Sequence, residues 1–170
     1  MIYCESMSDA ALSEAVKDHK RFVLVGCPGC ANTSLYLRNA ADGSAMMTLS
    51  PLGLKAVSML EEMDRLAQLF SRQGKKADAW MGTYPLGILC VPDKRFRNKI
   101  RRHCQGYDAV ITLSCDGGTK TVEKIMNGNT VIPAMKAKGI ATAVMKNNML
   151  FTKFYVDRNS ADIVGFTVHE

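Results

Sequence analysis

The fold of this chain is decided by the stretch Arg21-Phe-Val-Leu-Val-Gly26-Cys27-Pro28-Gly29-Cys30. Its beginning is a compact apolar run that stops at Gly26, which is typical of a short buried strand. A two-residue gap then separates Cys27 from Cys30, and this spacing lets two thiolates hold the same metal ion. The stretch therefore predicts a buried strand that ends directly at a candidate metal site.

Further apolar runs follow at intervals that leave room for helices. Strands are predicted at residues 86–91, 108–113 and 130–132, and helices at residues 8–19, 50–72, 94–105 and 117–126. Residues 154–156 and 163–166 are two more short strand candidates, and residues 39–50 are expected to form a mobile loop. Strands that alternate with helices indicate an α/β fold, here a single three-layer domain with a mostly parallel sheet and crossover helices.

The length and composition are those of one globular domain. The chain has 170 residues, of which 47% are hydrophobic and 22% are charged, and this is the usual range for a folded domain. We treat residues 1–170 as one metal-binding domain. It consists of an N-terminal helical segment (1–20), a core (21–135) and C-terminal strands (136–170).

The chain is expected to be cytoplasmic. No stretch approaches the run of about 18 apolar residues that a membrane span requires. The N-terminal residues lack the basic-then-apolar order of a secretion signal. In a reducing compartment, the six cysteines are expected to serve as metal ligands or redox groups rather than as disulfides.

Four cysteines are predicted to meet at one edge of the sheet. Cys27, Cys90 and Cys115 each lie at the carboxyl end of a predicted strand, and in an open parallel sheet these ends share one edge. Cys30 joins them through its spacing from Cys27. Four thiolates around a tetrahedral Zn²⁺ are the simplest outcome, although Cys90 and Cys115 can also be interpreted as small buried hydrophobic residues.

Two other interpretations of the cysteine pair stay open. A Cys-x-x-Cys between a strand and a helix is also typical of thioredoxin-like oxidoreductases, with Cys27 as nucleophile and Cys30 as resolving thiol. That chemistry leaves Cys90 and Cys115 unexplained. An iron–sulfur cluster also uses four cysteines. The pattern alone assigns no catalytic residue and no further cofactor-binding residue.

The remaining cysteines and the histidines receive no role in the site. Cys104 follows the apolar stripe of the predicted helix 94–105 and is expected in the core. Cys4 lies near the chain terminus, which we expect to be loose. The histidines fall outside the predicted strand ends, so we expect them at the surface or in the core: His19, His103 and His169.

The net charge of +6 is concentrated in one segment. Residues 94–102 contain six basic side chains and no acid, which favours an anionic partner. Phe96, Ile100 and Cys104 recur at helical spacing, so one stripe of this helix should be buried and its basic face solvated. With a single aromatic residue inside the run, we do not expect nucleic acid to bind. The basic residues are Lys94, Arg95, Arg97, Lys99, Arg101 and Arg102.

The order of the cysteine motifs resembles a known zinc-binding family. This family forms the C-terminal domain, or a separate small subunit, of bacterial methylenetetrahydrofolate reductases. The similarity covers residues 25–30 with Cys27 and Cys30, the single Cys90, and residues 108–118 with Cys115-Asp-Gly-Gly118. Residues 131–134, a strand followed by proline, are similar to the family's next segment.

The resemblance implies an accessory module of one-carbon metabolism rather than an independent enzyme. Such a module acts beside a flavin-dependent reductase or a corrinoid methyl-transfer protein. The basic helix would then suit an acidic partner surface or an anionic folate. No residue in the chain stands out as a flavin site, so we expect a non-catalytic subunit.

Overall fold

A parallel sheet forms the centre of the molecule. The computed structural model describes residues 1–39, 44–49, 57–82, 87–141, 143–148 and 151–157. Four strands pair in the order β4-β2-β5-β6, and every pairing among them is parallel. The α/β fold predicted from the sequence is therefore confirmed. The strands are β2 (Arg21–Gly26), β4 (Lys76–Met81), β5 (Ala109–Leu113) and β6 (Thr130–Pro133).

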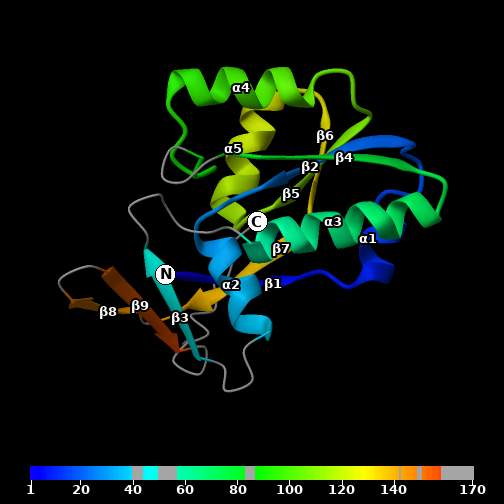
Figure 1. The fold of residues 1–170 in the computed structure, drawn as a ribbon. Helices are drawn as coiled ribbons and strands as arrows, with labels where there is room; N and C mark the ends of the chain where they lie inside the picture. The colour runs from blue at the N-terminus through cyan, green and yellow to red at the C-terminus, as the bar shows by residue number, and fades with distance from the viewer. Residues whose placement is uncertain (40–43, 50–56, 83–86, 142, 149–150, 158–170) are drawn as a thin grey trace.

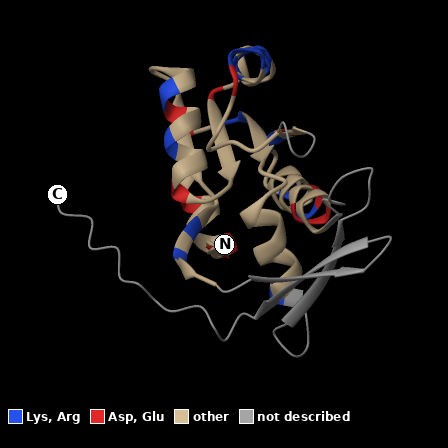
Figure 2. Ribbon diagram, turned by 90° about the vertical axis from the view of Figure 1, so that its left-hand side faces the viewer, with Lys and Arg blue, Asp and Glu red and all other residues tan. Residues whose placement is uncertain are grey.

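Helices cover both faces of this sheet (Figure 1). The chain passes from β2 outward to β4 and then back past β2 to β5 and β6. Because crossover connections are right-handed, the connection from β2 to β4 must lie on one face of the sheet, and the connections from β4 to β5 and from β5 to β6 must lie on the other. In Figure 2, α3 and α5 accordingly lie on opposite sides of the sheet. The helices are α1 (Asp9–Ala15), α2 (Cys30–Asn39), α3 (Val57–Arg72), α4 (Lys94–Cys104) and α5 (Asp116–Met126).

The direction of strand order reverses between β2 and β5. We call the carboxyl ends of these two neighbouring strands the switch point. Just beyond them, the N–H of Cys27 donates a hydrogen bond to the carbonyl of Leu113 at 3.0 Å. The connections after β2 and β5 leave toward opposite faces, and in open α/β sheets this divergence creates a crevice where ligands bind.

Two smaller antiparallel sheets accompany the central one. One has the order β1-β7 and the other β3-β9-β8. The chain terminus is ordered, because the amino group of Met1 donates to the carbonyl of Ala141 at 2.8 Å. Their strands are β1 (Ile2–Ser6), β7 (Met135–Ile140), β3 (Ser44–Leu49), β8 (Ala143–Asn148) and β9 (Phe151–Asp157).

The prediction of a strand at residues 86–91 is wrong. Residues 87–91 form turns, and the strand of this part of the chain is β4 instead. β4 lies at the edge of the sheet and its residues are only partly buried, so its sequence lacks a continuous apolar run. Leu89, which suggested a buried strand, is buried as part of a turn that covers the end of the core.

The elements predicted at residues 108–113, 117–126 and 130–132 agree with β5, α5 and β6, whereas the remaining predictions agree only in part. α1 begins after Ser8, whose hydroxyl accepts the N–H of Ala11, but it ends at Ala15 rather than at residue 19. α3 ends at Arg72 as expected, whereas its predicted start at residue 50 lies outside the described residues. The predicted loop 39–50 contains β3, so that prediction is wrong. β9 includes residues 154–156, and residues 163–166 lie outside the described part.

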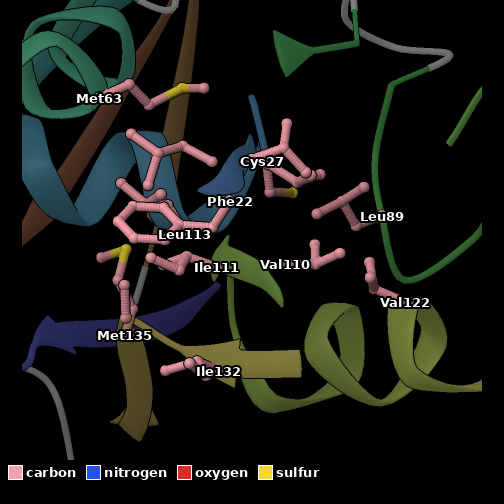
Figure 3. Packing of buried hydrophobic residues seen from close by; sticks show 14 of the residues in the cluster. Phe22, Cys27, Met63, Leu89, Val110, Ile111, Leu113, Val122, Ile132 and Met135 are labelled. Carbon is pink, nitrogen blue, oxygen red and sulfur yellow. The ribbon is translucent and has the colours of Figure 1, made fainter. Parts of the chain in front are cut away.

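The core is continuous from the sheet to the switch point (Figure 3). Phe22 of β2 meets Phe70 of α3 edge to face, with ring centroids 4.8 Å apart. Val122 of α5 is buried in the same cluster. Figure 3 shows Cys27 next to Leu89, so the turn that carries Leu89 closes the core at its carboxyl edge. Residues at this edge of the sheet, including Cys27 and Cys115, therefore pack against the hydrophobic core.

Candidate functional site

Cys27 is the first residue after β2, and its turn leads directly into α2 at Cys30. Its side chain is only 4% exposed. Burial raises the pKa of the Cys27 thiol to about 11, although the backbone N–H groups of Leu89 and Gly29 donate to the sulfur and oppose this rise. The nearby Cys115 and Cys90 thiols add to it. Cys27 is thus a buried thiol with other thiols as neighbours.

Cys115 lies on the other side of the switch point. It follows β5 by two residues and occupies the N-cap position of α5. Cys30 holds the first position of α2, so each of these two cysteines lies where the positive end of a helix dipole favours negative charge. Two helix N-termini therefore flank the crevice, and each carries a thiol.

Buried hydroxyl groups form a hydrogen-bonded chain that ends at the backbone carbonyl of Cys115. The Thr112 and Thr119 hydroxyls lie 2.9 Å apart, and the Ser114 and Thr119 hydroxyls lie 3.1 Å apart. Ser114 also donates to the carbonyl of Cys115 at 3.1 Å. Because these groups satisfy one another in the core, the position of Cys115 is well determined.

Cys90 reaches the same place from a turn rather than from a strand end. A Cβ added to Gly117 would lie 3.7 Å from the Cβ of Cys90 and 3.9 Å from the Sγ of Cys115. Burial raises the pKa of the Cys90 thiol, and the Cys115 and Cys30 thiols raise it further. Cys90 was predicted to join the site because it was expected at the end of a strand, and that reason is wrong. Cys90 is nevertheless a neighbour of Cys115. Its side chain is exposed, unlike that of Cys27.

Cys4 is a fifth thiol in this region and was missed by the sequence analysis. It lies in β1 and is buried. Burial raises the pKa of its thiol to about 12, and the Cys115 and Cys30 thiols contribute to this rise. The expectation of a loose terminus is wrong. The short apolar run Ile2-Tyr3-Cys4 could have indicated a strand, but nothing in the local sequence places it beside the other cysteines.

The thiols gather without already forming a ligand set. Among the described residues, no three His, Cys, Asp or Glu side chains are arranged so that they could hold a metal ion. The chemistry of the donors nevertheless suits a thiophilic ion, since thiolates are the ligands that select zinc and iron–sulfur clusters. We call Cys27, Cys30, Cys90 and Cys115 the switch-point cysteines.

Cys104, His103 and His19 lie outside the site, as expected. Cys104 is buried in α4, and burial alone raises the pKa of its thiol to about 12. His103 is exposed on α4, and its ring stacks on Trp80 with centroids 4.7 Å apart. His19 is partly buried at the end of the α1 region. His169 lies outside the described residues.

The basic helix α4 has the predicted two-sided character. Phe96, Ile100 and Cys104 are buried, and the six basic side chains of residues 94–102 are exposed. In Figure 2 the helix at the top is accordingly mostly blue. A cavity of about 500 Å³ borders this helix, and its lining includes Trp80, Phe96, Lys99, Arg102 and His103.

Comparisons with family models, curated proteins and solved structures found no match. Within the described ranges, no helix has both the length and the apolar character that crossing a membrane requires. A proposal about function therefore depends on the chemistry of the switch-point cysteines and on the basic helix.

Proposed function

We propose that the protein is a zinc-binding module in which the switch-point cysteines hold one Zn²⁺ through their thiolates. The observation that carries this proposal is the gathering of thiols from distant parts of the chain at the crevice between β2 and β5. The N–H groups that donate to the sulfur of Cys27 are of the kind that orient and stabilise metal-bound thiolates. Binding requires the four side chains to move closer together, because no three of them are arranged for a metal ion in the described part of the chain.

A thioredoxin-like function has less support. Its attacking cysteine must be an accessible thiolate with a lowered pKa. Cys27 is 4% exposed, and burial raises its pKa to about 11. A metal ion reverses this preference, because a bound dication stabilises several thiolates at once. The same thiols are therefore poor nucleophiles but suitable ligands.

We place this module in cytoplasmic one-carbon metabolism, as a non-catalytic partner of a larger enzyme. The support is the similarity of the cysteine motifs to the zinc-binding domain of bacterial methylenetetrahydrofolate reductases. All six cysteines are free, which fits a reducing compartment. A zinc ion held only by thiolates is usually structural, so the partner, a flavin-dependent reductase or a corrinoid methyl-transfer protein, would supply the chemistry.

Metal analysis with thiol labelling tests the zinc proposal. We expect about one zinc per chain in anaerobically purified protein, and its loss in Cys115→Ser, because Cys115 neighbours Cys27, Cys90 and Cys4. Cys104→Ser is the matched control, since Cys104 is also buried but has no cysteine neighbour among the causes of its raised pKa. Iodoacetamide should label the exposed Cys90 slowly until a strong chelator removes the ion, as followed by peptide mass.

Other results would contradict this proposal in distinct ways. Rapid labelling of Cys27 alone, unchanged by the chelator, would support the oxidoreductase instead. A brown protein that contains iron and inorganic sulfide would identify an iron–sulfur cluster at the same cysteines. Equal metal content in Cys115→Ser and the unmodified protein would remove the site from the switch point.

The basic face of α4 is the proposed docking surface for the anionic partner or folate. The single tryptophan of the chain, Trp80, lines the cavity next to it, so its fluorescence should report binding. We expect polyglutamylated methyltetrahydrofolate to change this fluorescence, and the double reversal Arg97→Glu/Arg101→Glu to weaken binding about tenfold or more. Binding should also weaken as salt is raised.

A second reversal separates local recognition from net charge. Arg72→Glu/Lys136→Glu changes the total charge equally at exposed positions outside α4 and outside α5, the helix packed against it. Affinity in this control should stay close to that of the unmodified protein. Equal losses in both double variants, or binding that is insensitive to salt, would show that α4 is not the docking surface.

A further inference from the structure

The cavity beside α4 has a wall of aromatic rings. Its volume is about 500 Å³, which is within the usual range for a small-molecule site. The Trp80 ring of β4 stacks on the His103 ring with centroids 4.7 Å apart and an interplanar angle of 19°, and its centroid lies 5.6 Å from that of the Phe96 ring. Three rings from two elements therefore border one space.

Another side of the cavity is formed by closely packed backbone. Gly82 and Gly87 both line it. A Cβ added to Gly82 would lie 2.5 Å from the Cε2 of Phe96 and 2.6 Å from the Cα of Gly87. The absence of a side chain thus lets the buried Phe96 ring and the chain at residue 87 come together at this point, which gives the cavity a preformed base.

The third component of the lining is positive charge. Lys99 and Arg102 line the cavity and are exposed, whereas no acidic side chain of the described residues lines it. Within the part of the chain that the structure describes, neither of the two forms an ion pair. Lys99 follows Phe96 by three residues and Arg102 follows Lys99 by three, and side chains at this spacing are neighbours on a helix. Both charges are therefore available to a ligand beside the aromatic wall.

We propose that this cavity binds a small molecule in which a planar heteroaromatic ring carries an anionic group. The ring packs against the aromatic wall, and the anionic group binds Lys99 and Arg102. Heterocyclic bases of every kind stack on aromatic side chains, and a guanidinium forms paired hydrogen bonds with phosphate or carboxylate. Nucleoside phosphates and folates share this chemistry.

This inference deepens the docking role proposed for α4, because it moves recognition from the outer basic face to the residues that line the cavity, and it does not depend on zinc. Exposed basic side chains alone attract any anion weakly and are screened by salt. An aromatic wall alone retains apolar groups of many shapes. Because the cavity joins the two, the ring and the anionic group should each contribute to affinity.

Titration calorimetry with whole ligands and their fragments tests this expectation. Adenosine monophosphate and methyltetrahydrofolate with a single glutamate represent the two sources. The fragments are adenosine and ribose phosphate for the first, and p-aminobenzoylglutamate for the second. At least one whole ligand should bind about tenfold or more tightly than its own fragments, since joining two groups makes the second contact intramolecular.

Variants of the lining locate the site. Lys99→Gln/Arg102→Gln should weaken binding of the whole ligand about tenfold or more, because it removes charged hydrogen-bond donors. Trp80→Leu should weaken it about tenfold by removing a stacking surface, and Trp80→Phe should restore most of the affinity. Lys94→Gln/Arg95→Gln is the matched control, since it removes the same charge from exposed positions of α4 that do not line the cavity. Far-ultraviolet circular dichroism checks that each variant folds.

The results separate this cavity from the docking surface proposed above. Failure of both whole ligands to bind, equal losses in the two glutamine double variants, or fragments that bind as tightly as the whole ligand would overturn the cavity site. Folate binding that is lost in Arg97→Glu/Arg101→Glu but kept in Lys99→Gln/Arg102→Gln would also overturn it, while leaving the docking surface intact. Adenosine monophosphate binding that is lost in Lys99→Gln/Arg102→Gln, without any binding of folate, would support the cavity as a nucleotide site and contradict folate as the ligand of α4.

Discussion

Replacing Gly87 with alanine should destabilise the protein and weaken metal binding together. A Cβ on Gly87 would lie 2.6 Å from both the Cα and the carbonyl oxygen of Gly82. These are backbone atoms, so no side-chain rotation relieves the clash and the chain itself must shift. Overpacking of this kind costs about 1–3 kcal/mol, and we expect the upper end of that range in urea unfolding.

The effect on metal binding follows from what the displaced segment carries. Gly87 lies two residues before Leu89, which closes the core, and three before Cys90. Zinc affinity, measured by competition with a chelating dye, should therefore fall in Gly87→Ala.

Gly117→Ala is the matched control, because the added Cβ would meet only ordinary contacts at 3.7 and 3.9 Å. Its stability should be unchanged or slightly higher, since alanine favours a helix. An equally stable Gly87→Ala would show that the approach to Gly82 is not rigid.

The central strands could be predicted from the sequence because they are buried on both faces. β2 and β5 are nearly continuous apolar runs, and every one of their residues except Arg21 is buried. β4 could not be found in the same way, because an edge strand is covered incompletely and its sequence mixes polar and apolar residues. The prediction of the wrong strand at residues 86–91 followed from this difference.

The positions of the cysteines, like the strands, could be predicted only where they depend on a central strand. Cys27 and Cys115 follow real central strands, so the rule for carboxyl strand ends places both at the switch point. Cys90 was included on the basis of a strand that does not exist. Its proximity to Cys115 comes from a turn that folds over the core, and a turn of this kind has no periodic pattern.

Cys4 was beyond reach of local sequence reasoning. Its position depends on the pairing of β1 with β7, which joins segments more than a hundred residues apart along the chain. Its hydrogen bond to Ser34 depends on the same packing. Contacts of this kind arise only once the elements have assembled.

Glu62 is a buried charge on which the packing of α3 depends. Its carboxylate is 4% exposed and accepts hydrogen bonds at 3.0 Å from both Arg38 and Arg65. Arg65 also pairs with Asp9 at 2.9 Å, so α1, α2 and α3 are connected through one network. Burial alone would raise the pKa of Glu62, but the hydrogen bonds from Arg65 and Arg38 outweigh this and lower it.

Glu62→Gln should therefore lower the free energy of unfolding by about 3 kcal/mol at neutral pH, since breaking a buried ion pair leaves its partners uncompensated. The two arginines are 42% and 43% exposed, so water recovers part of the loss and the effect should not exceed this value. Urea unfolding at pH 7 is the measurement. Glu61→Gln, at the exposed neighbouring position, is the control and should change stability by less than about 0.5 kcal/mol.

The pH dependence follows from the lowered pKa of Glu62. A carboxyl group whose pKa is lower in the folded than in the unfolded state stabilises the fold fully above its unfolded value. This contribution disappears as the pH falls through the lower, folded value. The difference in stability between the unmodified protein and Glu62→Gln should accordingly be largest at neutral pH and shrink steadily from about pH 5 toward pH 3. A difference that stays constant over this range would show that the loss comes from altered packing rather than from the charge of Glu62.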